Sequence, residues 1–139
     1  MSCWRDGALT ASGLAAAVAL VLAALTGPSR AQQGNAADGA DVFKKCHACH
    51  EVGPAAKNKV GPLLNGIIAR RAGTIAGFNY SEANKAAGAQ GLVWAEQTLQ
   101  KYLENPLAFM PGTKMAFAGL RDEQDRQDLI AYLKTFSTQ

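Results

Sequence analysis

The chain has 139 residues, a formal net charge of +3 and 48% hydrophobic residues. Its length is that of one domain, and its apolar content excludes an intrinsically disordered protein. Its three cysteines exclude a disulfide-rich scaffold, and its weak charge excludes nucleic-acid binding. No apolar run reaches about 18 residues, which excludes a multi-pass membrane protein. We expect a small, soluble, monomeric domain.

The first 31 residues have the order of a secretory signal peptide, with an apolar stretch over residues 14–25. Small side chains at Ser29 and Ala31 suit cleavage directly afterwards. The alternative is an uncleaved membrane anchor, for which the apolar stretch is short. We expect residues 1–31 to be removed on export, leaving an exported domain over residues 32–139.

The remaining residues predict an all-α domain, with helices at both ends and long loops between them. Asp38 is a candidate N-cap for a first helix that carries Val42, Phe43 and Cys46 on one face. Residues 52–76 are rich in glycine and proline and predict loops.

Three further helices are predicted. A serine cap and a glycine stop mark one over residues 81–88. Another covers residues 94–105 and ends at Pro106, after which residues 107–120 predict a loop. The clearest helix covers residues 122–136, with acidic residues in its first turn and a stripe formed by Leu129, Tyr132, Leu133 and Phe136.

Residues 46–50, Cys-His-Ala-Cys-His, have the C-x-x-C-H spacing by which c-type haem is attached. Side chains three residues apart on a helical turn face the same side, so Cys46 and Cys49 can each form a thioether with one haem vinyl group. His50 follows directly and can place a ring nitrogen on the iron. We expect one haem c, bound covalently through both cysteines.

The same residues allow other interpretations. A redox dithiol usually accompanies a βαβ pattern, and none is visible. A structural zinc site needs four ligands, yet the cysteines and histidines after residue 31 all lie within these five positions. A surface disulfide is the third alternative.

A low-spin haem iron needs a sixth ligand, and Met110 and Met115 are the candidates. Both lie in the proline- and glycine-rich stretch 105–119, whose backbone is free to wrap the edge of a cofactor. A methionine in such a loop can equally fill a core. Spacing alone does not choose between the two.

Several short runs occur in an order that strongly resembles class I c-type cytochromes, a family that includes mitochondrial cytochrome c and bacterial relatives. The resemblance covers about residues 39–136. Its runs are Cys46-His47-Ala48-Cys49-His50, Gly61-Pro62-Leu63, Gly77-Phe78-Asn79-Tyr80-Ser81, Tyr102-Leu103-Glu104-Asn105-Pro106, Pro111-Gly112-Thr113-Lys114-Met115 and Asp128-Leu129-Ile130-Ala131-Tyr132-Leu133.

The resemblance implies a role for each matching position. Met115 would be the second axial ligand beside His50, and Met110 merely apolar. The carbonyl of Pro62 would accept from the proximal imidazole. The remaining roles fall into three groups: Arg70, Tyr80 and Trp94 would hold the haem propionates, Asn84, Tyr102 and Thr113 would lie near the methionine sulfur, and Phe117 would lie at the exposed haem edge.

Some positions depart from the family pattern. Ala69 stands where a glycine is usual, and a longer stretch over residues 88–93 indicates the bacterial branch. The expected basic ring at the haem edge is thin, comprising Lys45, Lys57, Lys59 and Lys114.

The resemblance implies a periplasmic electron carrier, not an enzyme. Its partners would be acidic faces of membrane redox complexes: a cytochrome bc-type complex, an oxidase or a photosynthetic reaction centre. The alternative function is a peroxidase-like or gas-binding haem protein that releases its methionine.

Overall fold

The computed structural model describes residues 33–137, so the expected signal segment over residues 1–31 lies outside the described residues. The described residues form five helices, and their β pairing is limited to an isolated antiparallel bridge between Arg71 and Val93. None of the described helices has the length and apolar character needed to span a bilayer. The prediction of an all-α domain is confirmed.

Helix α1 spans Ala36–Phe43, and its N-cap is Asn35. The Asn35 side chain accepts a hydrogen bond from the backbone N–H of Ala37 at 2.9 Å. The prediction of Asp38 as the cap is therefore wrong. An amide side chain begins the helix three residues earlier, and Asp38 becomes an acidic residue of the first turn, where it complements the helix dipole.

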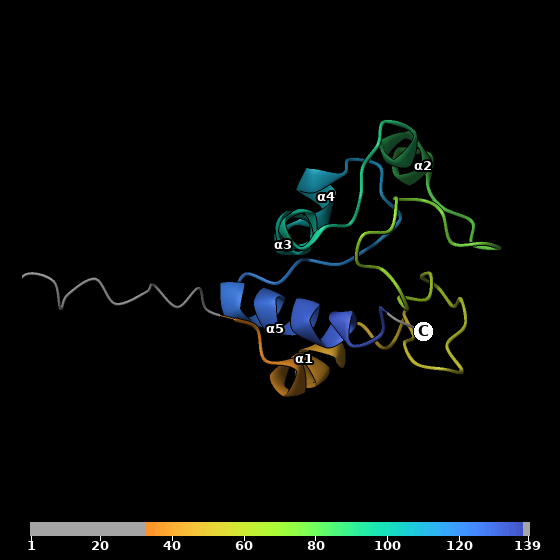
Figure 1. Ribbon diagram of the computed structural model, residues 1–139. Helices are drawn as coiled ribbons and strands as arrows, with labels where there is room; N and C mark the ends of the chain where they lie inside the picture. Colours follow the sequence, from red (N-terminus) through yellow and green to blue (C-terminus); the bar gives the residue numbers. More distant parts are fainter. Residues whose placement is uncertain (1–32, 138–139) are drawn as a thin grey trace, which may run out of the picture. The chain divides into compact units, whose positions relative to one another are not determined.

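Helix α5 spans Glu123–Lys134 and is capped by the Asp122 side chain, which accepts from the N–H of Gln124 at 2.7 Å. The predicted helix over residues 122–136 is confirmed, with its ends serving as cap and final turn. α5 lies between α1 and α3 and packs against both (Figure 1). The rings of Phe43 and Tyr132, 5.4 Å apart between centroids, join α1 to α5.

Helix α3 spans Glu96–Glu104, so it begins two residues later than predicted. Trp94 precedes the helix because its backbone N–H is bonded to the carbonyl of Arg70. Pro106 follows the end of α3 as expected, but it also opens a short helix α4, Pro106–Phe109, where a loop was predicted. Proline suits the first position of a helix because its missing N–H would have no partner there.

Helix α2 spans Glu82–Ala89, and the Ser81 side chain caps it by accepting from the N–H of Asn84 at 3.1 Å. The predicted serine cap is confirmed, and the helix passes the predicted glycine stop by one residue. The prediction of loops over residues 52–76 is also confirmed.

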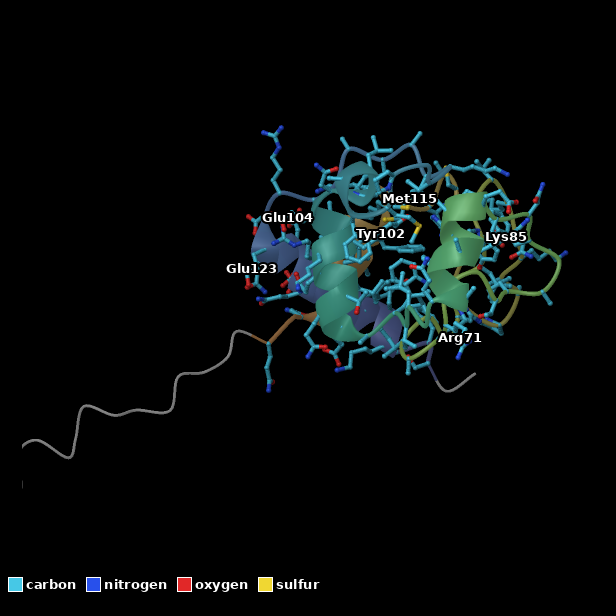
Figure 2. All side chains as sticks on the ribbon, turned by 90° about the horizontal axis from the view of Figure 1, so that it is seen from above. Arg71, Lys85, Tyr102, Glu104, Met115 and Glu123 are labelled. Atoms are coloured by element: carbon cyan, nitrogen blue, oxygen red, sulfur yellow. The ribbon has the colours of Figure 1, made fainter. Side chains whose placement is uncertain are left out.

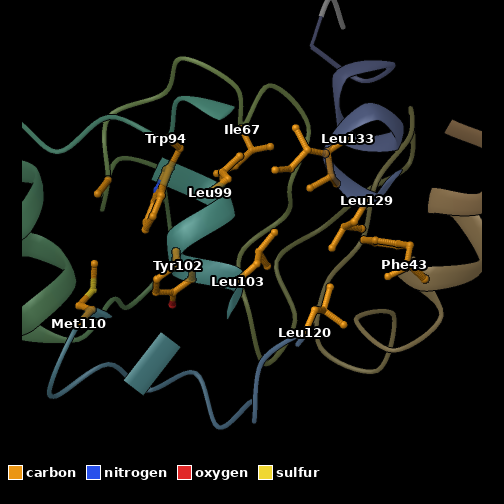
Figure 3. Packing of buried hydrophobic residues seen from close by; sticks show 13 residues of the cluster. Phe43, Ile67, Trp94, Leu99, Tyr102, Leu103, Met110, Leu120, Leu129 and Leu133 are labelled. Carbon is orange, nitrogen blue, oxygen red and sulfur yellow. The ribbon is translucent and has the colours of Figure 1, made fainter. Parts of the chain in front are cut away.

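The apolar core gathers side chains from α1, α3, α5 and the loops beside them (Figure 3). Its most deeply buried member is Leu129 on α5, with 1% of its surface exposed. The largest other members are Phe43, Ile67, Trp94, Leu99, Tyr102, Leu103, Met110, Leu120, Ile130 and Leu133.

Candidate functional site

A cavity of about 290 Å³ opens beside this core, and its walls are mainly apolar. Helix α3, the turn after α1, and loops from both halves of the chain contribute to its walls. Every site residue that the sequence predicted lines it: Cys46, Cys49, His50, Pro62, Arg70, Tyr80, Asn84, Trp94, Tyr102, Thr113 and Met115. These residues are spread over 70 positions of the sequence, so the tertiary fold is needed to bring the others to Cys46, Cys49 and His50.

The Cys-His-Ala-Cys-His run continues α1 as a series of hydrogen-bonded turns. The N–H of Cys46 is bonded to the carbonyl of Phe43 at 2.8 Å, and the N–H groups of Cys49 and His50 are both bonded to the carbonyl of Cys46 at 3.0 Å. This local helical geometry places both thiols and the imidazole on the wall of one cavity. His47, between them, is exposed and does not line it.

The imidazole of His50 is oriented by the backbone. Its Nδ1 lies 2.7 Å from the carbonyl oxygen of Pro62, and a carbonyl can only accept, so Nδ1 carries the proton. Burial lowers the pKa of His50, and the bond to Pro62 opposes that shift. The ring is therefore neutral, and Nε2 keeps a lone pair available for a metal ion.

Gly61 belongs to the Gly61-Pro62-Leu63 run, but the sequence did not predict its contact with His50. A Cβ atom at this position would collide with the imidazole ring. The N–H of Gly61 is bonded to the carbonyl of Cys49 at 2.9 Å, which ties this backbone to the motif. The glycine therefore permits a close approach that any side chain would prevent.

The two candidate methionines have different environments. Met115 lines the cavity, whereas Met110 is 5% exposed and packs into the core. The hydroxyl of Tyr102 donates to the sulfur of Met115 at 3.2 Å, and Figure 2 shows the two side chains close together beside α3. The Thr113 hydroxyl lies 3.4 Å from the same phenol and accepts from the N–H of Met115 at 3.3 Å.

Polar groups occupy another part of the wall. Arg70 donates to the carbonyl of Asn65 at 2.8 Å, and burial lowers its pKa. Burial raises the pKa of Tyr80, and the nearby Arg70 opposes that shift. Asn84 has a side-chain oxygen that is buried with no hydrogen-bond partner among the described residues. An acceptor without a partner at a cavity wall is suited to a bound group or an ordered water.

The donor set fits a haem. Two thiols three residues apart, an imidazole with a free Nε2 and a thioether face the same apolar space, with arginine, tyrosine and tryptophan donors at its wall. Burial raises the pKa of the Cys46 thiol to about 11, with the nearby Lys45 opposing it. A redox dithiol needs a thiol with a lowered pKa, so this environment does not favour that alternative.

Comparison with known proteins decides the family. Residues 36–137 match the family model for cytochrome c. The chain belongs to the cytochrome c family. It is 54% identical over 117 residues to cytochrome c2 of Blastochloris viridis, covering 84% of this chain and 88% of that protein.

Another relative and a solved structure support the same family. Cytochrome c-550 of Ancylobacter novellus is 59% identical over 101 residues, covering 73% of this chain and 94% of that protein. The solved structure of cytochrome c2 from Rhodospirillum centenum is similar with a TM-score of 0.72 and 51% identity, covering 75% of this chain and 99% of that one. The resemblance to class I c-type cytochromes is thereby confirmed. This cytochrome c is a single-haem electron carrier, with haem c attached covalently through Cys46 and Cys49.

Proposed function

We propose that this cytochrome is a soluble periplasmic protein that carries single electrons between membrane-bound redox complexes of a respiratory or photosynthetic chain. In this proposal His50 would bind the haem iron through Nε2, and Met115 would bind it through its sulfur. The observation that carries it is that both side chains line one cavity with the two attachment cysteines, while each is held by its own hydrogen bond.

When bound, haem supplies reversible one-electron chemistry at its iron. The contribution of the chain is to hold both ligands in fixed places. Pro62 fixes the orientation of the His50 ring, and the Tyr102 hydroxyl holds the Met115 sulfur. Ligands held in this way stay in place in both oxidation states, which keeps reorganisation small and electron transfer fast.

The surroundings favour the reduced state. A thioether ligand raises the reduction potential relative to a harder ligand. Apolar walls exclude water and disfavour the additional positive charge of the oxidised form. The cavity is lined largely by residues such as Leu64, Ile67 and Leu99.

Lysines at the cavity provide modest steering toward acidic partner faces. Lys45 and Lys114 line the cavity together with Phe117. Lys45 is 2.9 Å from Asp125, and Lys59 is 3.2 Å from Glu51, so each already has an internal counter-charge. Among the described residues, Lys57 and Lys114 make no ion pair. The positive charge that is free to attract an acidic partner is therefore small, which suits a short-lived complex.

Three measurements test this proposal. The ferric protein is expected to show the absorption band of sulfur bound to iron, and the ferrous protein is expected not to bind carbon monoxide readily at neutral pH. Ready binding of carbon monoxide would instead favour the gas-binding alternative. The mass of protein recovered from the periplasm tests export, because removal of residues 1–31 and addition of one haem both change it.

A further inference from the structure

The segment that carries Met115 has few backbone bonds of its own. We call residues 111–119 the Met strap. Within it, the N–H of Thr113 is bonded to the carbonyl of Met110 at 3.0 Å. The backbone of residues 114–119 is hydrogen-bonded to no other segment of the described chain. The strap therefore depends on its side chains and on how its two ends are held.

The N-terminal end is held by packing, because Met110 is 5% exposed within the core. The C-terminal end is held by hydrogen bonds and a close backbone contact. The N–H of Leu120 is bonded to the carbonyl of Leu103 at 2.7 Å. Gly119, with φ +93°, lies so close to the carbonyl of Glu104 that a Cβ atom would overlap it. Figure 3 shows Leu120 near Leu103 in the core.

Arg126 of α5 completes this anchor. Its Nη1 donates to the carbonyl of Leu120 at 2.6 Å and to that of Arg121 at 2.9 Å. Its Nε donates to the side-chain oxygen of Gln100 on α3 at 3.1 Å. One guanidinium thus joins α5, α3 and the residues that follow the strap.

Burial makes these bonds costly to break. Arg126 is 8% exposed, and no carboxylate among the described residues forms an ion pair with it. If residues 120 and 121 moved away, a buried cation would lose the two carbonyls that satisfy it. Arg126 therefore opposes any opening of the strap that includes its C-terminal end.

We propose that Arg126 is a positioning residue for Met115. By fixing the C-terminal end of the Met strap, it sets how readily Met115 leaves the iron, although it does not line the cavity. This inference rests on the proposed function, because it takes Met115 as an axial ligand. In this inference, opening of the strap also displaces residues 120 and 121.

The test is the affinity of the ferric holoprotein for imidazole, which can bind iron only after Met115 has left. The apparent affinity is proportional to the population of the open form. Arg126→Gln is expected to bind imidazole about tenfold more tightly than wild type, the effect of losing roughly one charge-assisted hydrogen bond. Arg126→Lys keeps the charge but cannot reach all three acceptors, and an intermediate affinity is expected.

Ile130→Val is the matched control, because Ile130 is 2% exposed on the same helix and contacts the core. It lowers the free energy of unfolding but keeps every hydrogen bond of the anchor, so its imidazole affinity should stay within about twofold of wild type. Guanidinium unfolding of each variant separately measures how much its free energy of unfolding has fallen. Gly119→Ala disturbs the same anchor from the strap side and should also tighten imidazole binding.

Arg126→Gln with the wild-type affinity, or Ile130→Val with an equal gain, would overturn the inference. If Arg126→Gln does not fold, Arg126→Lys and Gly119→Ala decide by the same criterion. Failure of the proposed function would be visible in the wild-type protein. If the ferric wild type lacks the sulfur-to-iron absorption band, Met115 is not a ligand, and the inference about Arg126 is overturned with it. The band in wild type, together with unchanged imidazole binding in the anchor variants, overturns only the role of Arg126.

Discussion

The hydroxyl of Tyr102 donates to the sulfur of Met115 over 3.2 Å. Tyr102 is buried on α3, where its ring packs against Trp94 at 4.8 Å between centroids. Burial raises the pKa of the Tyr102 phenol, and the nearby Thr113 hydroxyl opposes that shift, so the phenol stays protonated and remains a donor near neutral pH. A side chain on helix α3 thus holds the sulfur of a residue in the loop that follows α4.

Tyr102→Phe removes this hydrogen bond and keeps the ring. The hydrogen bond draws electron density from the sulfur, so its loss makes the sulfur a stronger donor and favours the ferric state. The reduction potential should fall by about 20–40 mV, the equivalent of a hydrogen bond worth about 0.5–1 kcal/mol. Redox titration measures it. Tyr132→Phe, on α5 and away from the cavity, should leave the potential unchanged.

Replacing each methionine in turn distinguishes the proposed iron ligand, Met115, from the core residue Met110. Met115→Ala should lower the potential on the order of 0.1 V and allow carbon monoxide to bind the ferrous protein, because the iron loses its thioether. Met110→Ala should leave both properties unchanged and lower the free energy of unfolding by about 2–5 kcal/mol, since it empties a buried position. Equal effects of the two variants on the potential would show that the ligand assignment is wrong.

Asp125 reduces the positive charge at the cavity edge because it pairs with Lys45 at 2.9 Å. Asp125→Asn should raise the bimolecular rate with an acidic membrane redox complex about twofold at low ionic strength, and the gain should disappear at high salt. Stopped-flow kinetics measure this. Glu96→Gln is the control, because it makes the same charge change and breaks a similar pair, with Lys134 at 2.7 Å, away from the cavity. An equal acceleration by both variants would contradict docking at the cavity edge.

Ala69 adopts a left-handed backbone conformation with φ +62°, which is unfavourable for any residue with a Cβ atom. Its N–H is bonded to the carbonyl of Trp94 at 3.1 Å, which holds it in that conformation. Ala69→Gly should therefore raise the free energy of unfolding by about 0.5–1 kcal/mol. Guanidinium denaturation checks this. Ala86→Gly, at an exposed position inside α2, should lower it by about 1 kcal/mol.

The attachment motif could be understood from local sequence because its geometry is local. Bonds between residues three and four apart place Cys46, Cys49 and His50 on one side of a turn, whatever the rest of the chain does. The helix over residues 122–136 was equally clear, because an aspartate cap and an apolar stripe support each other within one segment.

Helix starts were less certain where several residues could serve as a cap. Asn35 and Asp38 both can accept from a helix N-terminus. The chain uses Asn35, whose own N–H is bonded to a carboxylate oxygen of Asp128 at 2.7 Å, 93 positions away. The residues around position 38 could not have predicted a hydrogen bond to a residue so far along the chain.

The sequence by itself predicted the all-α class and, together with the family resemblance, the covalent attachment of haem and a set of candidate site residues. Local spacing left Met110 and Met115 equivalent, because both lie in one loop with the same composition. The family resemblance favoured Met115, and the tertiary structure supplies the physical difference: Met110 is packed into the core, while Tyr102 from α3 holds the sulfur of Met115 at the cavity. The same holds for the anchor at Arg126, because a buried cation finds its carbonyl partners only after α3 and α5 have packed.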